Sequence, residues 1–198
     1  MNYLAHAWLS FNNPGILVGN MISDFVKGKK QYDYPDVIHK GILLHRAIDN
    51  FTDTHAVTQE MKLFFKPHYR LYAGAFCDVA YDHFLANDSG EFKAEGQLPA
   101  FAAATYKILE ENFAVLPPAF QKMLPYMTAH DWLSNYKTKW GIEKSFEGLV
   151  RRSAFLTESA TAFELFNSHY AEMKVLYHQF YPELKNFTVY QLQQLLVT

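Results

Sequence analysis

The chain has 198 residues, of which 49% are hydrophobic, and this is most simply one domain with a core of its own. Its 20 acidic and 18 basic residues form no block of like charge, which argues against wholesale nucleic-acid binding. One cysteine excludes an internal disulfide. Because no stretch has the pattern of a signal peptide or the roughly 20 apolar residues of a membrane span, we expect a soluble, cytoplasmic protein.

The first two helices are predicted over residues 1–11 and 16–26, separated by a turn rich in Asn, Pro and Gly. His6 lies in the middle of the first helix, and Asp24 lies among apolar residues near the end of the second. The second helix is followed by three lysines, Lys27, Lys29 and Lys30. Such a group is either a solvated helix end or a patch that attracts an anion beside the aspartate.

Two longer helices, predicted over residues 36–51 and 67–87, carry charged groups on their apolar faces. Residues four apart in a helix share one face, and in both helices that face is the one expected to pack in the core. The charged positions are His45 and Asp49 on the first helix, and Asp78, Asp82 and His83 on the second. Like charges at this spacing destabilise a helix unless something neutralises them.

The rest of the chain is also predicted to be helical, including a helix that is capped by Thr52 or Thr54 and ends at Pro67. The polar segment at residues 87–97 is the best candidate for a mobile loop, and no later stretch alternates with the period of a strand. The last long helix carries an aromatic packing seam and is predicted to end at Pro182. The His130-Asp131 dipeptide has no further histidine or carboxylate at helical spacing and is interpreted as a helix cap. The sequence therefore predicts an all-α, single-domain helical bundle of about eight to ten helices.

A buried carboxylate without a partner is costly, so it must be paired, protonated or bound to a metal. Arg46 and Lys27 are the only basic residues in these stretches, and the carboxylates outnumber them. A divalent cation is the simplest solution, and mixed oxygen and imidazole ligands suit manganese, magnesium, iron or zinc. Each residue alone has another interpretation, as a core histidine, a cap or an intrahelical pair, and their co-occurrence predicts the metal site. The inward-facing candidates are His6, Asp24, His45, Asp49, Asp78, Asp82 and His83.

Four segments follow one another in order, MNYLAHAWLS, GNMISDFVKG, GILLHRAIDNFTD and CDVAYDHFL. In order and spacing they resemble the acyl carrier protein phosphodiesterases, strongly over the first 90 residues. The resemblance implies a divergent HD-domain-like fold, with metal-site helices in residues 1–90 and supporting helices in residues 98–198. It also implies a manganese-dependent enzyme, with Mg²⁺ or Fe²⁺ as alternatives, that cleaves the phosphodiester joining 4′-phosphopantetheine to a serine of acyl carrier protein.

The resemblance also implies roles for the individual residues. The expected metal ligands are Asp24, His45, Asp78, Asp82 and His83. The expected catalytic residues are His6, Arg46, which would clamp a phosphate oxygen, and Asp49, which is also a further candidate ligand. The expected substrate-binding residues are Asn20, Lys27, Lys29, Lys30 and Arg70, the basic ones by attracting the acidic carrier protein. Two other functions stay open: an HD-like phosphohydrolase for a nucleotide or another small phosphodiester, and a non-catalytic helical protein that binds an apolar ligand.

Overall fold

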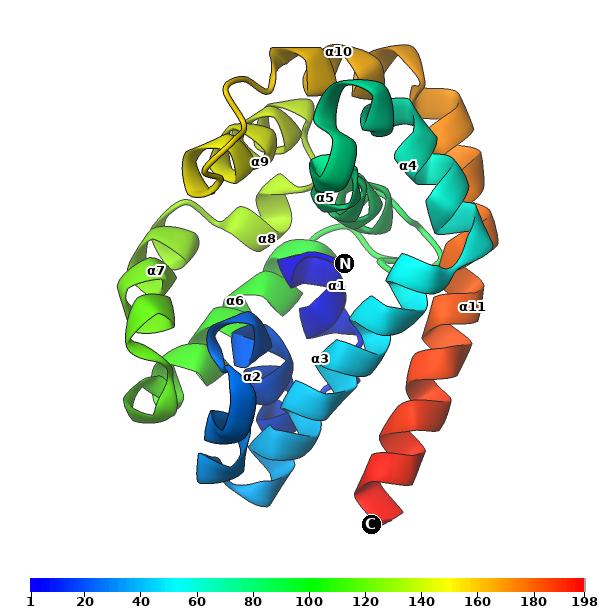
Figure 1. Ribbon diagram of the computed structural model, residues 1–198. Coiled ribbons are helices and arrows are strands. Elements are labelled where there is room, and N and C mark those ends of the chain that lie inside the picture. The colour runs from blue at the N-terminus through cyan, green and yellow to red at the C-terminus, as the bar shows by residue number, and fades with distance from the viewer. Residues whose placement is uncertain (198) are drawn as a thin grey trace.

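The computed structural model describes residues 1–197, and over that range it consists of eleven α-helices and four short 3₁₀ helices, with no strand (Figure 1). The predicted all-α class is confirmed. The N-terminal part contains α1 (Tyr3–Trp8), α2 (Pro14–Ile22), η1 (Ser23–Phe25), η2 (Gly28–Asp33), α3 (Asp36–Thr54), α4 (Ala56–Tyr69), η3 (Arg70–Tyr72) and α5 (Ala73–Ala86).

The C-terminal part wraps around these helices. It contains α6 (Gln97–Glu111), η4 (Phe113–Val115), α7 (Pro118–Ala129), α8 (Trp132–Asn135), α9 (Lys139–Arg152), α10 (Ala160–Ser168) and α11 (Tyr170–Val197). Figure 1 shows α11 running beside α3 and α4 on one side, while α6, α7 and α8 lie on the other. Among the described residues, no helix combines the length and the apolar character needed to cross a membrane.

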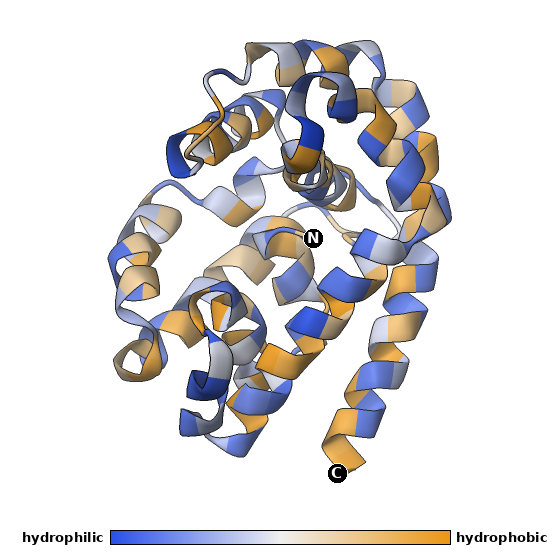
Figure 2. Ribbon diagram, in the orientation of Figure 1, coloured by the Kyte–Doolittle hydropathy of each residue, from blue (hydrophilic) through white to orange (hydrophobic). Residues whose placement is uncertain are grey.

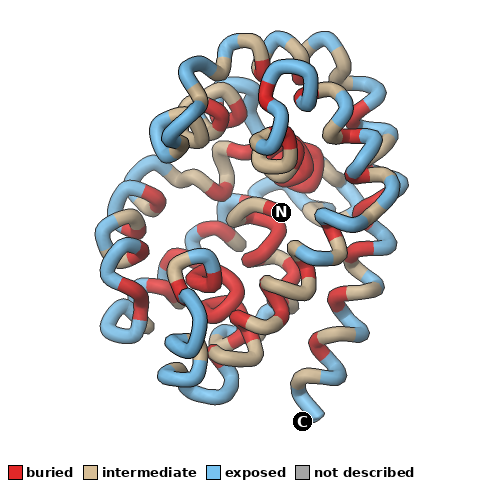
Figure 3. The backbone as a smooth tube through the Cα atoms, viewed as in Figure 1, coloured by how far each residue is buried: buried red, intermediate tan, exposed pale blue. Residues whose placement is uncertain are grey.

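The short helix α1 lies near the middle of the molecule, and α5 passes close to it. The most continuous buried segments are in α1, α2 and α5 (Figure 3). On the outer helices apolar and polar residues alternate instead, as along α3 and α11 (Figure 2), so that each presents one apolar face inward. Every α-helix contributes buried residues to one hydrophobic cluster. Polar groups on α1 and α5 are therefore placed in the interior.

Helices α2 and α3 cross at two glycines that have no room for a side chain. A Cβ atom on Gly19 would collide with the backbone of α3 at Ile38 and Gly41, and a Cβ atom on Gly41 would collide with the backbone of α2 at Ile16. The two backbones therefore approach more closely than other residues would allow. This contact holds the C-terminal half of α2 and the following η1 directly against α3, which positions the polar residues described below.

Two predicted helix ends are wrong, and both involve proline. Pro67 lies inside α4, which continues to Tyr69, and Pro182 lies inside α11. A proline within a helix leaves the carbonyl four residues earlier without its partner. Those residues, Leu63 and His178, are exposed, so water can satisfy the carbonyls. The seam expected on one last helix is also divided, because the chain breaks between α10 and α11.

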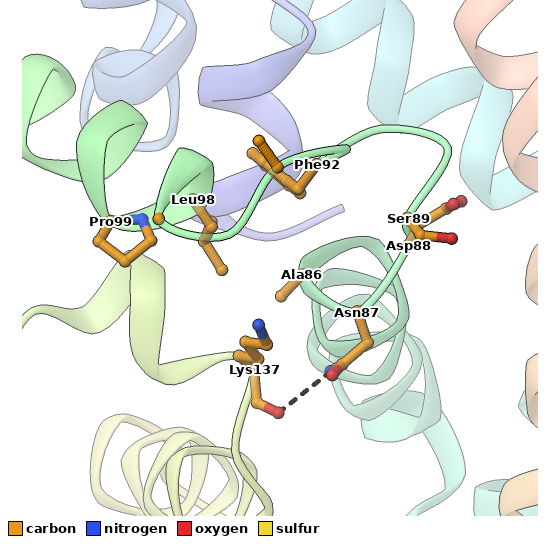
Figure 4. A pocket seen from close by; sticks show the side chains of 10 residues that line it. Ala86, Asn87, Asp88, Ser89, Phe92, Leu98, Pro99 and Lys137 are labelled. Atoms are coloured by element: carbon orange, nitrogen blue, oxygen red, sulfur yellow. Dashed lines mark hydrogen bonds between the residues drawn. The ribbon is translucent and has the colours of Figure 1, made fainter.

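The loop between α5 and α6 is tied down by hydrogen bonds at three points. Trp8 on α1 donates to Glu91 (2.7 Å), Tyr177 on α11 donates to Asp88 (2.9 Å), and Asn87 donates to the carbonyl of Lys137 (3.1 Å; Figure 4). The loop borders a small pocket of about 150 Å³. These contacts do not favour the mobile loop that the sequence predicts.

Candidate metal centre

The structure brings His6, His45 and Asp49 together where α1 meets α3. One ligand atom from each lies within 4.8 Å of the others. Nε2 of His6 is 3.2 Å from Oδ1 of Asp49, and Nε2 of His45 is 3.0 Å from Oδ2. The predicted i,i+4 pair on α3 is therefore present, and α1 adds a second imidazole from a distant part of the sequence. We call these three residues the His–His–Asp cluster.

Asn20 fixes the orientation of both imidazoles. Its Nδ2 donates to the carbonyl of His6 (2.8 Å) and to Ser10 (3.2 Å), which leaves Oδ1 to accept from Nδ1 of His6 (2.8 Å). The main-chain carbonyl of Asn20 accepts from Nδ1 of His45 (2.7 Å). Both rings therefore carry a proton on Nδ1 and turn Nε2 toward Asp49. Metal-binding histidines are usually held in this way, through a hydrogen bond from the ring nitrogen that does not bind the ion.

One nitrogen in this cluster has no hydrogen bond. The side chain of His6 is 3% exposed, and although its Nε2 lies near Asp49, it forms no hydrogen bond with any described residue. The rings of His6 and His45 stack with centroids 3.8 Å apart. Leaving a buried polar atom unpaired costs about 1–3 kcal/mol. A cation between the two rings and the carboxylate would remove that cost, so the residues present fit a divalent metal.

Asp24 lies at the open edge of the cluster. Its Oδ1 is 3.2 Å from Nε2 of His45, and its side chain is 71% exposed. Burial would lower the pKa of His45, but Asp24 and Asp49 outweigh it and raise that pKa to about 9. Burial and the charge of His45 lower the pKa of His6 to about 4. Burial opposes ionisation of Asp49, yet the neighbouring cationic groups keep the pKa of Asp49 well below its usual range. Two ionised carboxylates thus converge where a cation is needed.

Asp78 is close to the cluster but has a partner already. The α-amino group of Met1 is buried and lies 3.0 Å from Oδ1 of Asp78 and 3.4 Å from Oδ1 of Asp49. Burial would lower the pKa of this amine, but the two carboxylates raise it to about 11. The charge on Asp78 is therefore balanced by an amine, and Asp78 is not grouped with the cluster.

Asp82 and His83 lie away from the cluster and have protein partners. The carboxylate of Asp82 accepts the backbone N–H groups of Asn2 (3.2 Å), Leu4 (2.7 Å) and Ala5 (3.3 Å), so it holds the first turn of α1. His83 is bonded through Nδ1 to the carbonyl of Tyr136 (2.7 Å) and through Nε2 to the hydroxyl of Tyr170 (3.0 Å). Neither residue is grouped with the cluster. In this structure both have anchoring contacts, and their expected ligand roles stay a prediction.

The predicted substrate-binding residues differ in their positions. Asn20 is fully buried, and its side chain contacts His6 and Ser10 in this structure. Arg46 donates to Gln31 (2.7 Å) and to the carbonyl of Val26 (3.0 Å), and both contacts fix the chain around η2. Its expected phosphate clamp is thus engaged elsewhere. The four basic residues Lys27, Lys29, Lys30 and Arg70 are all exposed.

Two features of the centre were not predicted from the sequence. One is the orienting role of Asn20, and the other is the α-amino group of Met1 beside Asp78. No spacing signal identifies either one, because both depend on how α1 packs between α2, α3 and α5. The cap at Asp131 is confirmed, since its side chain accepts from the N–H of Ser134 at the start of α8.

Comparison with known proteins adds an independent line of evidence. The family model described as acyl carrier protein phosphodiesterase matches residues 1–184. An acyl carrier protein phosphodiesterase of Yersinia pestis is 32% identical over 184 residues, which cover 93% of this chain and 95% of the relative. One of Photorhabdus laumondii is 31% identical over 182 residues, covering 92% of each chain. No solved structure matches. The matched region includes the whole cluster, and the chain belongs to the acyl carrier protein phosphodiesterase family.

Proposed function

We propose that this protein hydrolyses the phosphodiester between 4′-phosphopantetheine and a serine of acyl carrier protein. Water attacks phosphorus, the bond from phosphorus to the serine oxygen breaks, and that oxygen takes up a proton. The products are apo-carrier protein and free 4′-phosphopantetheine. The observation that carries this proposal is the buried Nε2 of His6, which faces Asp49 and His45 without a hydrogen bond in a chain of this family.

The His–His–Asp cluster would hold a divalent cation, with Asp24 as a further ligand at the open edge. Two imidazoles with carboxylates suit Mn²⁺, the ion expected from the resemblance, and also Fe²⁺ or Zn²⁺. Such a cation, when bound, lowers the pKa of water and neutralises charge on phosphoryl oxygens. The role of the protein is to present Nε2 of His6 and Nε2 of His45 in fixed directions, which Asn20 does through hydrogen bonds to both rings.

The proton of the attacking water needs an acceptor that solvent and substrate can reach. Asp24 meets this requirement because its side chain is largely exposed. The hydrogen bond from His45 lowers the pKa of Asp24, so the carboxylate is ionised near neutral pH, and the oxygen that does not bind the cation would accept the proton. Asp49 is less suited, because both of its oxygens face imidazoles.

Recognition of the carrier protein would use the exposed lysines that follow η1. Three lysines follow Val26 and lie within six residues of Asp24 in the sequence: Lys27, Lys29 and Lys30. An acidic partner would be attracted to this patch, and the attraction would place its modified serine near the open edge of the cluster. Arg70 lies at the α4–α5 junction and is a further exposed cation.

The proposal is tested by incubating holo-carrier protein with the purified protein and Mn²⁺, and following the mass of the carrier protein. We expect loss of the 4′-phosphopantetheine mass, no loss in the presence of a chelator, and no loss with His45→Ala. His68→Ala is the matched control, because that histidine is exposed on α4 and outside the cluster. An intact holo-carrier protein after incubation with the wild-type protein and Mn²⁺ would contradict the proposal.

A further inference from the structure

A groove of about 560 Å³ lies between α1, α7, α8 and α9. Its walls are mainly apolar, with several aromatic side chains, and it is within the size range of small-molecule sites. Aromatic and apolar side chains without a packing partner on one side favour a ligand with methyl and methylene groups. The wall residues that matter here are Tyr3, Met123, Tyr126, Trp132, Tyr136 and Trp140.

The end of the groove at Asn2 and Tyr3 lies close to the His–His–Asp cluster. The lining residue Asn2 follows Met1, whose amine is 3.4 Å from Asp49, and the lining residue Tyr3 is one helical turn before His6. From the other side, Phe25 of η1 packs on Phe120 of α7 with ring centroids 5.4 Å apart. This contact places the segment that carries Asp24 beside a helix of the groove wall.

One cation that lines the groove has no partner among the described residues. Lys144 and Arg151 also line the groove, but both pair with Glu147, at 2.7 Å and 3.5 Å. Arg152 also lines the groove, is exposed, and its guanidinium has neither an ion pair nor a hydrogen bond with any residue from 1 to 197. Burial raises the pKa of Tyr3 to about 12. The charge of Arg152 lowers this pKa and the charge of Asp24 raises it, so both charged groups lie near the Tyr3 hydroxyl.

The groove also retains polar groups that suit an amide. Oδ1 of Asn2 accepts from Tyr3, but no hydrogen bond in the described part of the chain uses its Nδ2. The hydroxyl of Ser145 donates to the carbonyl of Gly141 and so keeps its oxygen free to accept. One donor and one acceptor on mainly apolar walls match an uncharged chain that contains secondary amides.

We propose that this groove binds the pantetheine arm of the substrate, with Arg152 holding the phosphate at the end next to the His–His–Asp cluster. The inference rests on the proposed function and assigns a place to the 4′-phosphopantetheine product. The arm is an uncharged chain with a gem-dimethyl group, two amides and a thiol, and its only charge is on the phosphate. Arg152 would take the phosphate-binding role expected of Arg46, whose guanidinium donates to Gln31 and to the carbonyl of Val26. The carrier protein itself would stay outside, at the edge formed by Asp24 and the lysines.

Gly148 offers a way to block the groove without disturbing the helix. It lines the groove on α9, and a Cβ atom there would meet only Nη2 of Arg151, at an ordinary contact distance of 3.8 Å. Gly148→Phe should fill the groove, whereas the matched control Gly148→Ala should leave it open. Binding of free 4′-phosphopantetheine is followed by the fluorescence of Trp132 and Trp140. We expect Gly148→Phe to weaken binding by about tenfold or more and Gly148→Ala by less than about twofold.

Arg152 is tested with two ligands that differ only in the phosphate. Arg152→Gln should weaken binding of 4′-phosphopantetheine by about tenfold and leave binding of pantetheine unchanged. Arg151→Gln is the matched control, since that neighbour already pairs with Glu147. Equal loss for both ligands would overturn the phosphate assignment. Equal binding by Gly148→Phe and the wild type, or no binding by the wild type at millimolar ligand, would overturn the groove assignment.

The binding experiment tests the groove assignment independently of the proposed function, because it needs no turnover. Binding of 4′-phosphopantetheine without cleavage of holo-carrier protein would support the groove assignment and contradict the hydrolase activity. Cleavage of holo-carrier protein at the wild-type rate by Gly148→Phe would support the hydrolase activity and contradict the groove assignment, because the arm would then bind and leave by another route.

Discussion

The His–His–Asp cluster and the Asp78–His83 segment of α5 contain similar residues, but they differ in whether every polar group has a partner within the protein. On α5, each charged or imidazole group has a partner within the protein: an amine for Asp78, three backbone amides for Asp82, and a carbonyl and a hydroxyl for His83. In the cluster, Nε2 of His6 has none. The difference shows that a carboxylate in the core needs a partner, and that the atom left unpaired marks where an external ligand would bind.

The largest effect is expected from removing the cluster itself. Asp49→Asn keeps the size of the side chain but removes the charge shared by His6 and His45. We expect activity to fall by about 1,000-fold, equivalent to about 4 kcal/mol of transition-state stabilisation, together with loss of bound metal. Elemental analysis and the mass-based cleavage assay measure both. Wild-type metal content in this variant would show that Asp49 is not a ligand.

Asp82→Asn should lower the stability of the protein and leave its metal content unchanged. The substitution replaces one oxygen of the carboxyl group that accepts three backbone N–H groups at the start of α1 by an NH₂ group, which cannot accept. We expect the free energy of unfolding to fall by about 3 kcal/mol, because hydrogen bonds to a buried carboxylate are lost or weakened. Denaturant unfolding measures the loss, and metal content per folded protein should stay unchanged. A variant as stable as the wild type but without metal would reverse the roles assigned to Asp82 and Asp49.

A smaller effect on the cluster is expected from Asn20→Ala. The substitution leaves His6, His45 and Asp49 in place but removes the hydrogen bond from Nδ1 of His6 to Oδ1 of Asn20. Loss of such a supporting bond typically costs about 10–100-fold in metal affinity. Calorimetric titration with Mn²⁺ measures the affinity. Ser10→Ala is the control, because the Ser10 hydroxyl bonds to Asn20 and to the carbonyl of His6 but to neither imidazole. Unchanged affinity in Asn20→Ala would contradict the orienting role.

The smallest effect concerns His83 and pH. Burial lowers the pKa of His83 to about 4, below its usual 6.5. As pH falls from 6.5 toward 4, the unfolded chain takes up a proton on this histidine that the folded protein does not. Stability should therefore decrease, by about 1–2 kcal/mol between pH 7 and pH 5. Thermal unfolding at both pH values measures the decrease, which should be smaller in His83→Gln. An equal decrease in both proteins would show that His83 does not contribute.

Much of the fold followed from sequence pattern. Helical spacing of apolar residues predicted the all-α class, and the pairing of His45 with Asp49 followed from their i,i+4 spacing on α3. The errors at Pro67 and Pro182 arose because local rules treat proline as a stop. In both helices the lost hydrogen bond belongs to an exposed residue, so packing of the opposite face outweighs it.

The sequence by itself determined that histidines and carboxylates occupy core positions and must therefore have partners. Only the tertiary structure decided which partners they have. Asp82 and Asp49 are equivalent by spacing, since each lies four residues after a polar group on an apolar helix face. The first turn of α1 brings three free amides to Asp82, whereas the next turn brings an imidazole to Asp49. The physical reason is that burial fixes the need for compensation, while the docking of a distant helix fixes what supplies it.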